Sequence, residues 1–203
     1  MGKTIGIGCL VGLLLVGIAA GVWLSGLYNG LVGENESVSR AWAQVEGAYQ
    51  RRADLIPNLV ATVKGSAQFE QETLQKVVEA RSRVGQVTAG ALQGVIDDPQ
   101  KLAQFQAAQD GLSSALSRLM VVVERYPELK STQAFGDLMV QLEGTENRIN
   151  VERNRYNEAA QGFNTRVKRF PTGFVVRLLG WDFKEKAYFQ SQPGAETAPK
   201  VQF

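Results

Sequence analysis

The sequence contains no histidine among its 203 residues. Histidine is the usual general base near neutral pH and the commonest metal ligand. Its absence excludes Ser-His-Asp triads, Cys-His pairs, the usual zinc sites and helical di-iron centres that need a Glu-x-x-His motif. A G-x-x-x-x-G-K-[ST] loop and a strand-borne G-x-G-x-x-G loop are missing as well. Only carboxylate or lysine chemistry would remain, and we expect no enzymatic activity, no metal and no cofactor.

Cysteine occurs once, at Cys9. A single cysteine excludes a disulfide within the chain, and its place in an apolar segment excludes thiolate metal sites from the rest of the protein. It is a poor lipidation site, because it lies too near the start and the apolar run follows it rather than preceding it. We expect Cys9 to act as a small apolar side chain.

Charge is absent from the 23 residues between Ile5 and Leu27. About 20 apolar residues in a helix span a hydrocarbon core of roughly 30 Å, and only a helix satisfies the backbone of a single segment there. The alternative is a cleaved signal peptide, with Ala19–Gly21 as the cleavage site. A retained anchor is favoured, because the run exceeds a signal h-region and only Lys3 supplies positive charge before it.

After the anchor, apolar residues recur with helical spacing and no alternating strand pattern of useful length is found. The first stripe starts at Val38 and carries Pro57, where we expect a kink before a turn at Gly65. The other helices are predicted over 67–87, from Pro99 with an aspartate cap to Tyr126, and over 132–169. The fold class is therefore all-α: a single transmembrane helix followed by an antiparallel up-and-down four-helix bundle with long helices. We divide the chain into an anchor at 1–28, a bundle at 29–189 and a flexible tail at 190–203.

Basic residues concentrate near the end of the last long helix. Residues 148–186 hold 9 basic and 4 acidic residues, whereas residues 28–147 hold 11 basic and 15 acidic ones. In an up-and-down bundle this end returns to the membrane, where lysine and arginine favour an anionic surface. The apolar stretch GFVVRLLGW follows at 173–181 and is typical of an interfacial segment, although it could instead cap the bundle core. The predicted membrane-interface residues are Arg166, Lys168, Arg169, Phe170, Phe174 and Trp181.

Several motifs resemble those of the LemA family of bacterial membrane proteins. The block AWAQVEGAYQRRADLIPNLVATVKG at 41–65 is similar to the family signature, and ERYPELK at 124–130 is similar to a family turn. Asn29, Leu31 and Val32 match an N-x-L-V pattern, Glu79–Arg81 match E-A-R, and Tyr156-Asn157, Phe163-Asn164 and Phe170-Pro171 match later family positions, as APKVQF at 198–203 matches family tails. Ser66 and Phe69 depart from the pattern. The resemblance implies a membrane helix, a helical bundle and no established catalytic activity. Family members are often encoded near membrane metallopeptidases, which suggests a regulatory or adaptor role.

The densest polar group within this signature comprises Arg51, Arg52, Asp54 and Asn58. As a functional site, these residues would present a paired-charge surface to a partner protein. As structure, Arg52 lies on the apolar stripe and would meet a carboxylate from another helix, while Asn58 would satisfy backbone groups freed by Pro57. Both readings are open at this level. Trp42, on the same stripe, is predicted to be a core residue.

Carboxylates crowd the last long helix at Glu143, Glu146 and Glu152. Without histidine, a carboxylate site would suit Ca²⁺ or Mg²⁺ and would need oxygens from several elements. Ion pairs are the commoner outcome at this spacing. For Glu152, which falls on the apolar row, we expect Arg52 or Arg81 as the partner.

Three features lead to a functional prediction: the uncharged N-terminal segment, the apolar stripes of the helices and the absence of catalytic motifs. Together they predict a non-enzymatic, single-pass protein that serves as a scaffold or adaptor for membrane-associated partners. Self-association and a membrane metallopeptidase partner are both open. The alternative is a lipid-surface-binding or membrane-shaping module. No nucleic-acid binding is expected, because the basic residues lack interleaved aromatics. We expect the bacterial cytoplasmic (inner) membrane, with the body on the extracytoplasmic or periplasmic side, since Lys3 precedes the anchor and Glu34 and Glu36 follow it.

Overall fold

The computed structural model describes residues 2–65, 70–91 and 94–190. Its elements are α1 (Gly2–Lys64), α2 (Gln71–Ala91), η1 (Val95–Asp97), α3 (Pro99–Val123), α4 (Pro127–Lys130), α5 (Gln133–Lys168) and α6 (Thr172–Leu179). Those described ranges contain helices and no strand, so the prediction of an all-α protein is confirmed.

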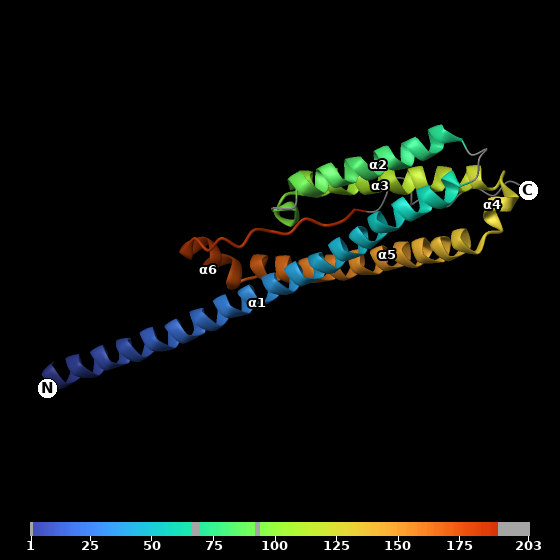
Figure 1. The fold of residues 1–203 in the computed structure, drawn as a ribbon. Helices are drawn as coiled ribbons and strands as arrows, with labels where there is room; N and C mark the ends of the chain where they lie inside the picture. Colours follow the sequence, from blue (N-terminus) through green and yellow to red (C-terminus); the bar gives the residue numbers. More distant parts are fainter. Residues whose placement is uncertain (1, 66–69, 92–93, 191–203) are drawn as a thin grey trace, which may run out of the picture.

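Helix α1 is one unbroken helix of 63 residues, about 95 Å at 1.5 Å per residue. Its first part stands free of the body, and the second part packs into it (Figure 1). By length and composition α1 can cross a membrane, and its most apolar window is unburied by the rest of the chain. Pro57 lies inside the helix without ending it. The same helix is therefore both the apolar N-terminal segment and a core element.

The helix ends lie close to the predicted ones. Asp98 caps α3 as expected: its side chain accepts hydrogen bonds from the backbone N–H groups of Gln100 and Lys101, and Pro99 occupies the first turn. Helix α5 begins just after Thr132 and ends at Lys168, before Pro171. Helix α2 starts at Gln71, somewhat later than predicted, and the short elements η1, α4 and α6 were not predicted as separate helices.

Two helix pairs build the body. Helix α1 packs along α5, and α2 packs along α3. The α1–α5 pair is antiparallel, because Glu34 contacts Arg166 near one end while Arg52 contacts Glu146 farther along. The up-and-down four-helix bundle remains our interpretation of this packing.

The hydrophobic core has two parts along the body axis. One cluster lies toward the free part of α1 and holds Trp42, Tyr156 and Phe163 among its buried residues. The other lies at the far end and includes Ile56 and Phe135. Along α1, the charged residue Arg52 falls between the residues that belong to the first cluster and those that belong to the second.

The chain returns along the body after α6 as an extended segment, residues 182–190, which we call the strap (Figure 1). Ala187 and Phe189 of the strap are buried against the first core cluster. Of the predicted flexible tail at 190–203, Gln190 is hydrogen-bonded to Gln106. Residues 191–203 lie outside the described part of the structure.

Candidate functional site

The most distinctive surface lies where the free part of α1 joins the body. Here Phe170, Pro171, α6 and the residues up to Trp181 form a unit that we call the foot (residues 170–181). The ring of Tyr28, one residue beyond the uncharged run, lies 4.9 Å from the ring of Trp181 and 5.6 Å from that of Phe183. The foot therefore lies beside the exit of the apolar segment from the body.

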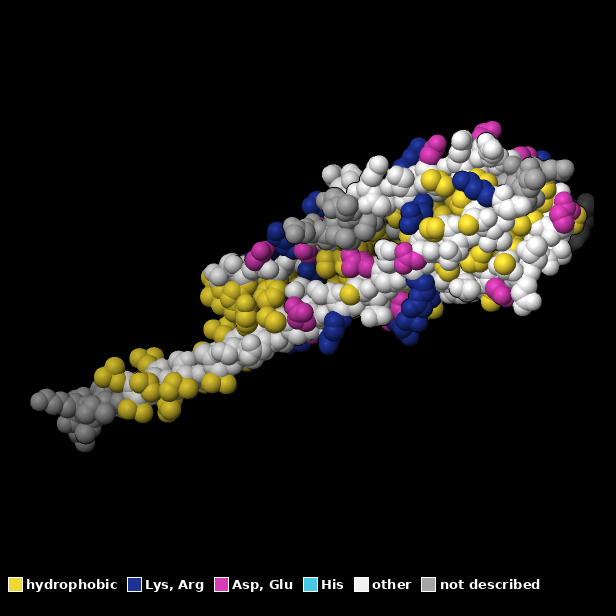
Figure 2. Space-filling model, viewed as in Figure 1, with side chains coloured by type: hydrophobic (Ala, Val, Ile, Leu, Met, Phe, Trp, Pro, Cys, Tyr) yellow, Lys and Arg dark blue, Asp and Glu magenta, His cyan; other side chains and the backbone are white. Residues whose placement is uncertain are grey.

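One side of the foot is apolar and exposed. Phe170, Phe174 and Leu178 are 81%, 61% and 68% exposed. Phe174 and Leu178 are four residues apart and so lie on one side of α6, whereas Phe170 lies in the turn just before that helix. Val175 and Val176 on the opposite side are buried. Figure 2 shows apolar side chains gathered at this end of the body, next to those of the free part of α1. Large exposed apolar patches mark interaction sites.

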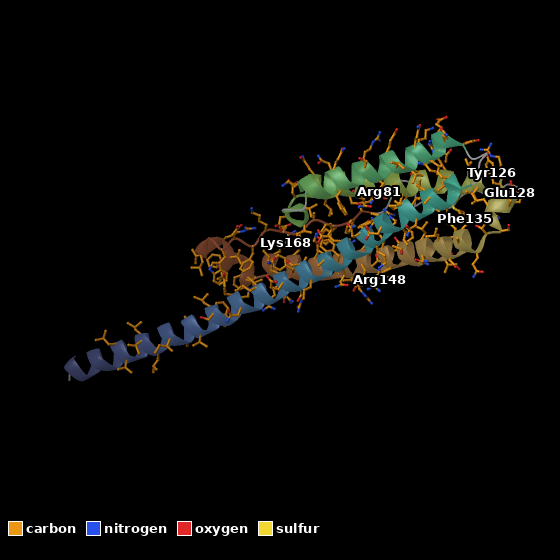
Figure 3. The ribbon with its side chains drawn as sticks, viewed as in Figure 1. Arg81, Tyr126, Glu128, Phe135, Arg148 and Lys168 are labelled. Atoms are coloured by element: carbon orange, nitrogen blue, oxygen red, sulfur yellow. The ribbon has the colours of Figure 1, made fainter. Side chains whose placement is uncertain are left out.

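Two of the three predicted basic interface residues are engaged in ion pairs. Arg166 donates to Glu34, and its guanidinium lies over Gly30 of α1. Lys168 is 2.7 Å from Glu185 of the strap, and this hydrogen bond raises the pKa of Lys168 above its usual value. Figure 3 shows Lys168 at the α6 end of the body. Arg169 is exposed, and no ion pair of Arg169 occurs within the described residues. Because Arg166 and Lys168 are already paired with carboxylates, they contribute less positive charge to the predicted contact with the membrane.

The strap is held by reciprocal amide bonds with α5. Asn164 donates to the carbonyl oxygen of Lys186 and accepts from its N–H, both at 2.8 Å. Asn157 makes the same pair with Phe189, at 3.1 and 3.0 Å. Seven residues of helix and three of extended chain both advance roughly 10 Å, so the two asparagines match the strap in register.

Side chains of the strap also enter the body. Phe189 stacks on Trp42 with ring centroids 5.8 Å apart, and Tyr156 donates its hydroxyl proton to the carbonyl oxygen of Ala187 at 2.8 Å. Lys186 is only 8% exposed and lies 2.6 Å from Asp97. These contacts fix the chain on the C-terminal side of the foot, so α6 is held from both ends.

Sequence reasoning missed the role of the strap. The Tyr156-Asn157 and Phe163-Asn164 pairs carried a signal, because two amides seven residues apart share one face of a helix. Their partners could not be inferred, since an extended segment has no helical or alternating pattern to detect.

Of the four residues predicted to form a partner surface, three are exposed and one is buried. Arg51, Asp54 and Asn58 are exposed on α1, and we call these three residues the outer face of α1. Asp54 accepts a hydrogen bond from Gln50 at 2.8 Å. Arg52 is 2% exposed, because adjacent helical residues point about 100° apart. Placing Arg52 on the partner surface was therefore wrong, and its structural reading holds.

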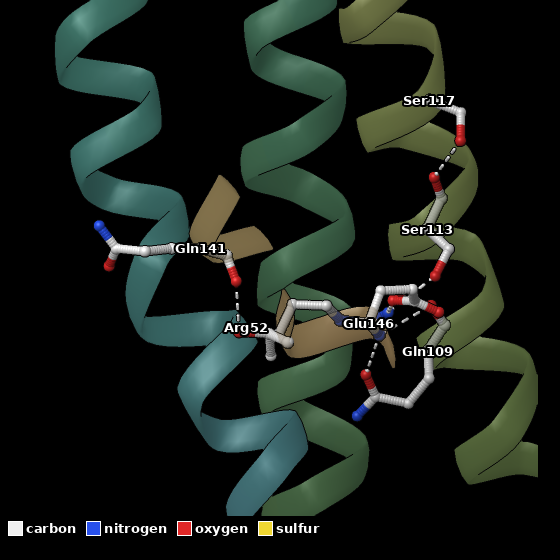
Figure 4. Close-up of polar contacts among 7 residues, drawn as sticks. Arg52, Gln109, Ser113, Ser117, Gln141 and Glu146 are labelled. Carbon is white, nitrogen blue, oxygen red and sulfur yellow. Dashed lines mark hydrogen bonds and ion pairs between the residues drawn. The ribbon is translucent and has the colours of Figure 1, made fainter. Parts of the chain in front are cut away.

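Arg52 crosses the body to reach α3 and α5 (Figure 4). Its guanidinium donates to Ser113 Oγ at 2.8 Å, to Glu146 Oε2 at 2.8 Å and to Gln109 Oε1 at 2.7 Å. It also lies 5.2 Å from the ring centroid of Tyr49. These bonds to both terminal nitrogens offset much of the cost of burying an arginine, although its Nε is buried without a hydrogen-bond partner among the described residues. The cluster joins three helices in one polar layer.

Two of the glutamates of α5, Glu146 and Glu152, make ion pairs. Glu152 is buried at 3% exposure and lies 3.0 Å from Arg155 and 3.5 Å from Arg148 of its own helix. The expectation that Arg52 or Arg81 pairs with Glu152 was wrong, because Arg52 reaches Glu146 and Arg81 donates to the carbonyl oxygen of Ala53. Among the described residues, no three metal-ligating side chains lie close enough together to hold a metal ion.

The sequence is similar to those of known proteins over most of its length. The model of the LemA family matches residues 41–203. Magnetosome proteins MamQ 1 and MamQ 2 of Paramagnetospirillum magneticum are each 28% identical over 184 residues, covering 84% of this chain and 67% of the relative. Protein LemA of Metamycoplasma hominis is 25% identical over 179 residues, covering 88% of this chain and 75% of that protein.

Proposed function

Because this chain belongs to the LemA family, we propose that it is a single-pass membrane protein whose helical body is a scaffold or adaptor for membrane-associated partners. The observation that carries this proposal is the continuity of α1. One helix provides the apolar segment and, without a break, the core residues Val38, Trp42 and Val45. A continuous helix transmits orientation, whereas a flexible linker would not.

The partner surface that we propose is the outer face of α1. Arg51, Asp54 and Asn58 recur at spacings of three and four and project from the helix that carries the anchor. Their direction relative to the membrane plane is therefore set by the anchor itself. We further propose that the paired helices form an up-and-down four-helix bundle around the two core clusters.

Photocrosslinking in cells tests the scaffold proposal. A photoreactive residue at Asn58 or Asp54 of the full chain should give discrete crosslinked products, identified by mass spectrometry. A flexible Gly-Ser insertion between Ser25 and Gly26, before the first packed residue Leu27, should remove those products while the protein stays in the membrane fraction.

The matched control is an insertion of the same length at the same place, made of strong helix formers and containing two helical turns. Because two turns nearly restore the facing direction, this variant should keep the crosslinks. Absence of any product from the natural chain, or equal products from all three chains, contradicts the proposal. Products at twice the chain mass of 22.2 kDa indicate self-association, and a membrane metallopeptidase would be recognised by its peptides.

For location, we propose the bacterial cytoplasmic (inner) membrane with the body on the extracytoplasmic side. Protease added to spheroplasts should then degrade the body and leave the anchor. A body protected until the cells are lysed would reverse the orientation.

A lipid-surface-binding or membrane-shaping module is the second candidate function. The exposed side chains of Phe170, Phe174 and Leu178 favour it. A shaping protein should change vesicle diameter or form tubules when the full chain is reconstituted at rising protein-to-lipid ratio, as seen by electron microscopy. Vesicles of unchanged shape favour the scaffold.

A further inference from the structure

We infer that α6 is a second membrane element, which lies in the boundary between headgroups and acyl chains of the bilayer that α1 crosses. It buries Phe174 and Leu178 there, together with Phe170 of the turn that precedes it, and so fixes the tilt of the body as well as its distance from the membrane. This inference rests on the proposed membrane insertion of α1.

The position of Tyr28 along α1, relative to the thickness of a bilayer, supports this placement. The 23 uncharged residues from Ile5 to Leu27 form a helix of roughly 34 Å, slightly more than a hydrocarbon core of about 30 Å. Tyr28 therefore lies at the edge of the hydrocarbon, where tyrosine and tryptophan are enriched. Because Trp181 contacts Tyr28, the C-terminal end of α6 lies at the same level.

The exposed face of α6 is held in place rather than loosely attached. Thr172, Val175 and Val176 are buried beneath it, and the backbone of Trp181 continues into the strap that Asn164 holds through Lys186. A helix fixed in this way presents its apolar side chains in one direction. Amphipathic helices of this kind lie in the interface with that side toward the acyl chains.

The arginines beside α6 support a lipid surface as the partner of its apolar side. The ion pairs nearby limit how much charge contributes to that contact. Arg169 and Arg177 flank the apolar side chains, and arginine can bury its stem while its head stays among the headgroups. Arg166 and Lys168 already pair with Glu34 and Glu185. The contact is therefore mainly apolar, and high salt should leave it in place, unlike a contact made by the basic cluster alone.

Depth-dependent quenching tests the inference on the full chain. After Cys9→Ser, single cysteines replace Leu14, Leu178 or Val140 and carry a fluorescent label. The proteins are reconstituted in vesicles of phosphatidylcholine and phosphatidylglycerol that contain a nitroxide either near the headgroups or deep in the acyl chains. Val140 is the matched control for Leu178, because it is exposed to a similar extent, 71% against 68%, but lies far from the foot.

The label at 178 should be quenched, and more strongly by the shallow nitroxide. The label at 14 should respond more to the deep one, and the label at 140 to neither. Phe174→Ser should reduce quenching at 178, whereas Val151→Ser, a change at another exposed apolar residue, should not.

Quenching at 14 but not at 178 overturns the inference and leaves the anchor intact. Failure at 14 instead rejects membrane insertion of α1, and with it the proposed function. A label at 178 that lipid nitroxides do not quench, but that native membranes shield from an aqueous quencher, means that a protein covers α6 and also overturns the inference.

Discussion

Replacing Arg52 separates a structural role from a partner-binding role. The guanidinium is buried and donates to Ser113, Glu146 and Gln109. Arg52→Ala removes these bonds and leaves a cavity, and Arg52→Met fills most of the cavity without restoring the bonds. Arg51→Met, on the outer face of α1, is the matched control because its side chain is exposed.

The expected loss of stability depends on which groups each substitution leaves unpaired and on how much packing it removes. In both Arg52 variants the buried amide oxygen of Gln109 loses its donor, which costs about 1–3 kcal/mol. Arg52→Ala adds the loss of packing around the aliphatic stem, which brings the expected total to about 3–5 kcal/mol. Glu146→Gln keeps a hydrogen-bond acceptor but leaves the buried guanidinium without its counter-charge, which should cost about 1–3 kcal/mol; the 47% exposure of Glu146 keeps this below the full cost of breaking a buried pair. Arg51→Met should lie within about 0.5 kcal/mol of the natural protein.

The assay is denaturant unfolding of the full chain in mild detergent, followed by far-ultraviolet circular dichroism. A double-mutant cycle isolates the bond: adding Gln109→Leu to Arg52→Met removes the unpaired oxygen, and should recover about 1–2 kcal/mol of the loss.

Equal stability of the natural protein and Arg52→Met would refute this reasoning. So would a double variant that shows only the sum of the two single effects. Either result would mean that the buried layer contributes no net stability beyond that of an apolar layer.

Three further predictions concern the strap, a half-buried carboxylate and a helix cap. Asn164→Ala should lower stability by about 1–3 kcal/mol and speed trypsin cleavage within the strap, whereas the exposed Asn154→Ala should change neither. Burial raises the pKa of Glu46, although the hydrogen bond from Trp42 lowers it in part. The folded state therefore loses stability as pH rises through that raised pKa. In thermal melts, Glu46→Gln should become more stable relative to the natural chain as pH rises from acidic to neutral. A difference in melting temperature that does not change with pH contradicts this. Asp98→Ala removes the α3 cap and should cost about 1 kcal/mol by denaturant unfolding, while an unchanged midpoint would show that the cap is dispensable.

Local patterns were read correctly where they depend on the period of a helix. The cap at Asp98, the end of α5 before Pro171 and the inward position of Trp42 all follow from short-range rules. Even the burial of Arg52 was implied by its place on the stripe. Which glutamate it meets depends on the axial register between α1 and α5, and periodicity within one helix carries no information on that register.

The foot shows the same limit. The composition of residues 173–181 was compatible with an interfacial helix and with a cap on the core. Packing adds which residues face which way: Val175 and Val176 turn inward, while Phe174 and Leu178 remain exposed. The ion pairs of Arg166 and Lys168 were equally out of reach, since their partners lie 132 and 17 residues away in the chain.

By itself, then, the sequence determined the all-helical class, the uncharged N-terminal helix, the LemA family and the approximate ends of the long helices. These properties depend on composition and on periods of a few residues. Only the tertiary structure decided that Arg52 bridges three helices and that the strap binds the asparagines of α5. Each of these depends on contacts between distant segments, whose geometry is set when the helices pack and is not encoded in any one local pattern.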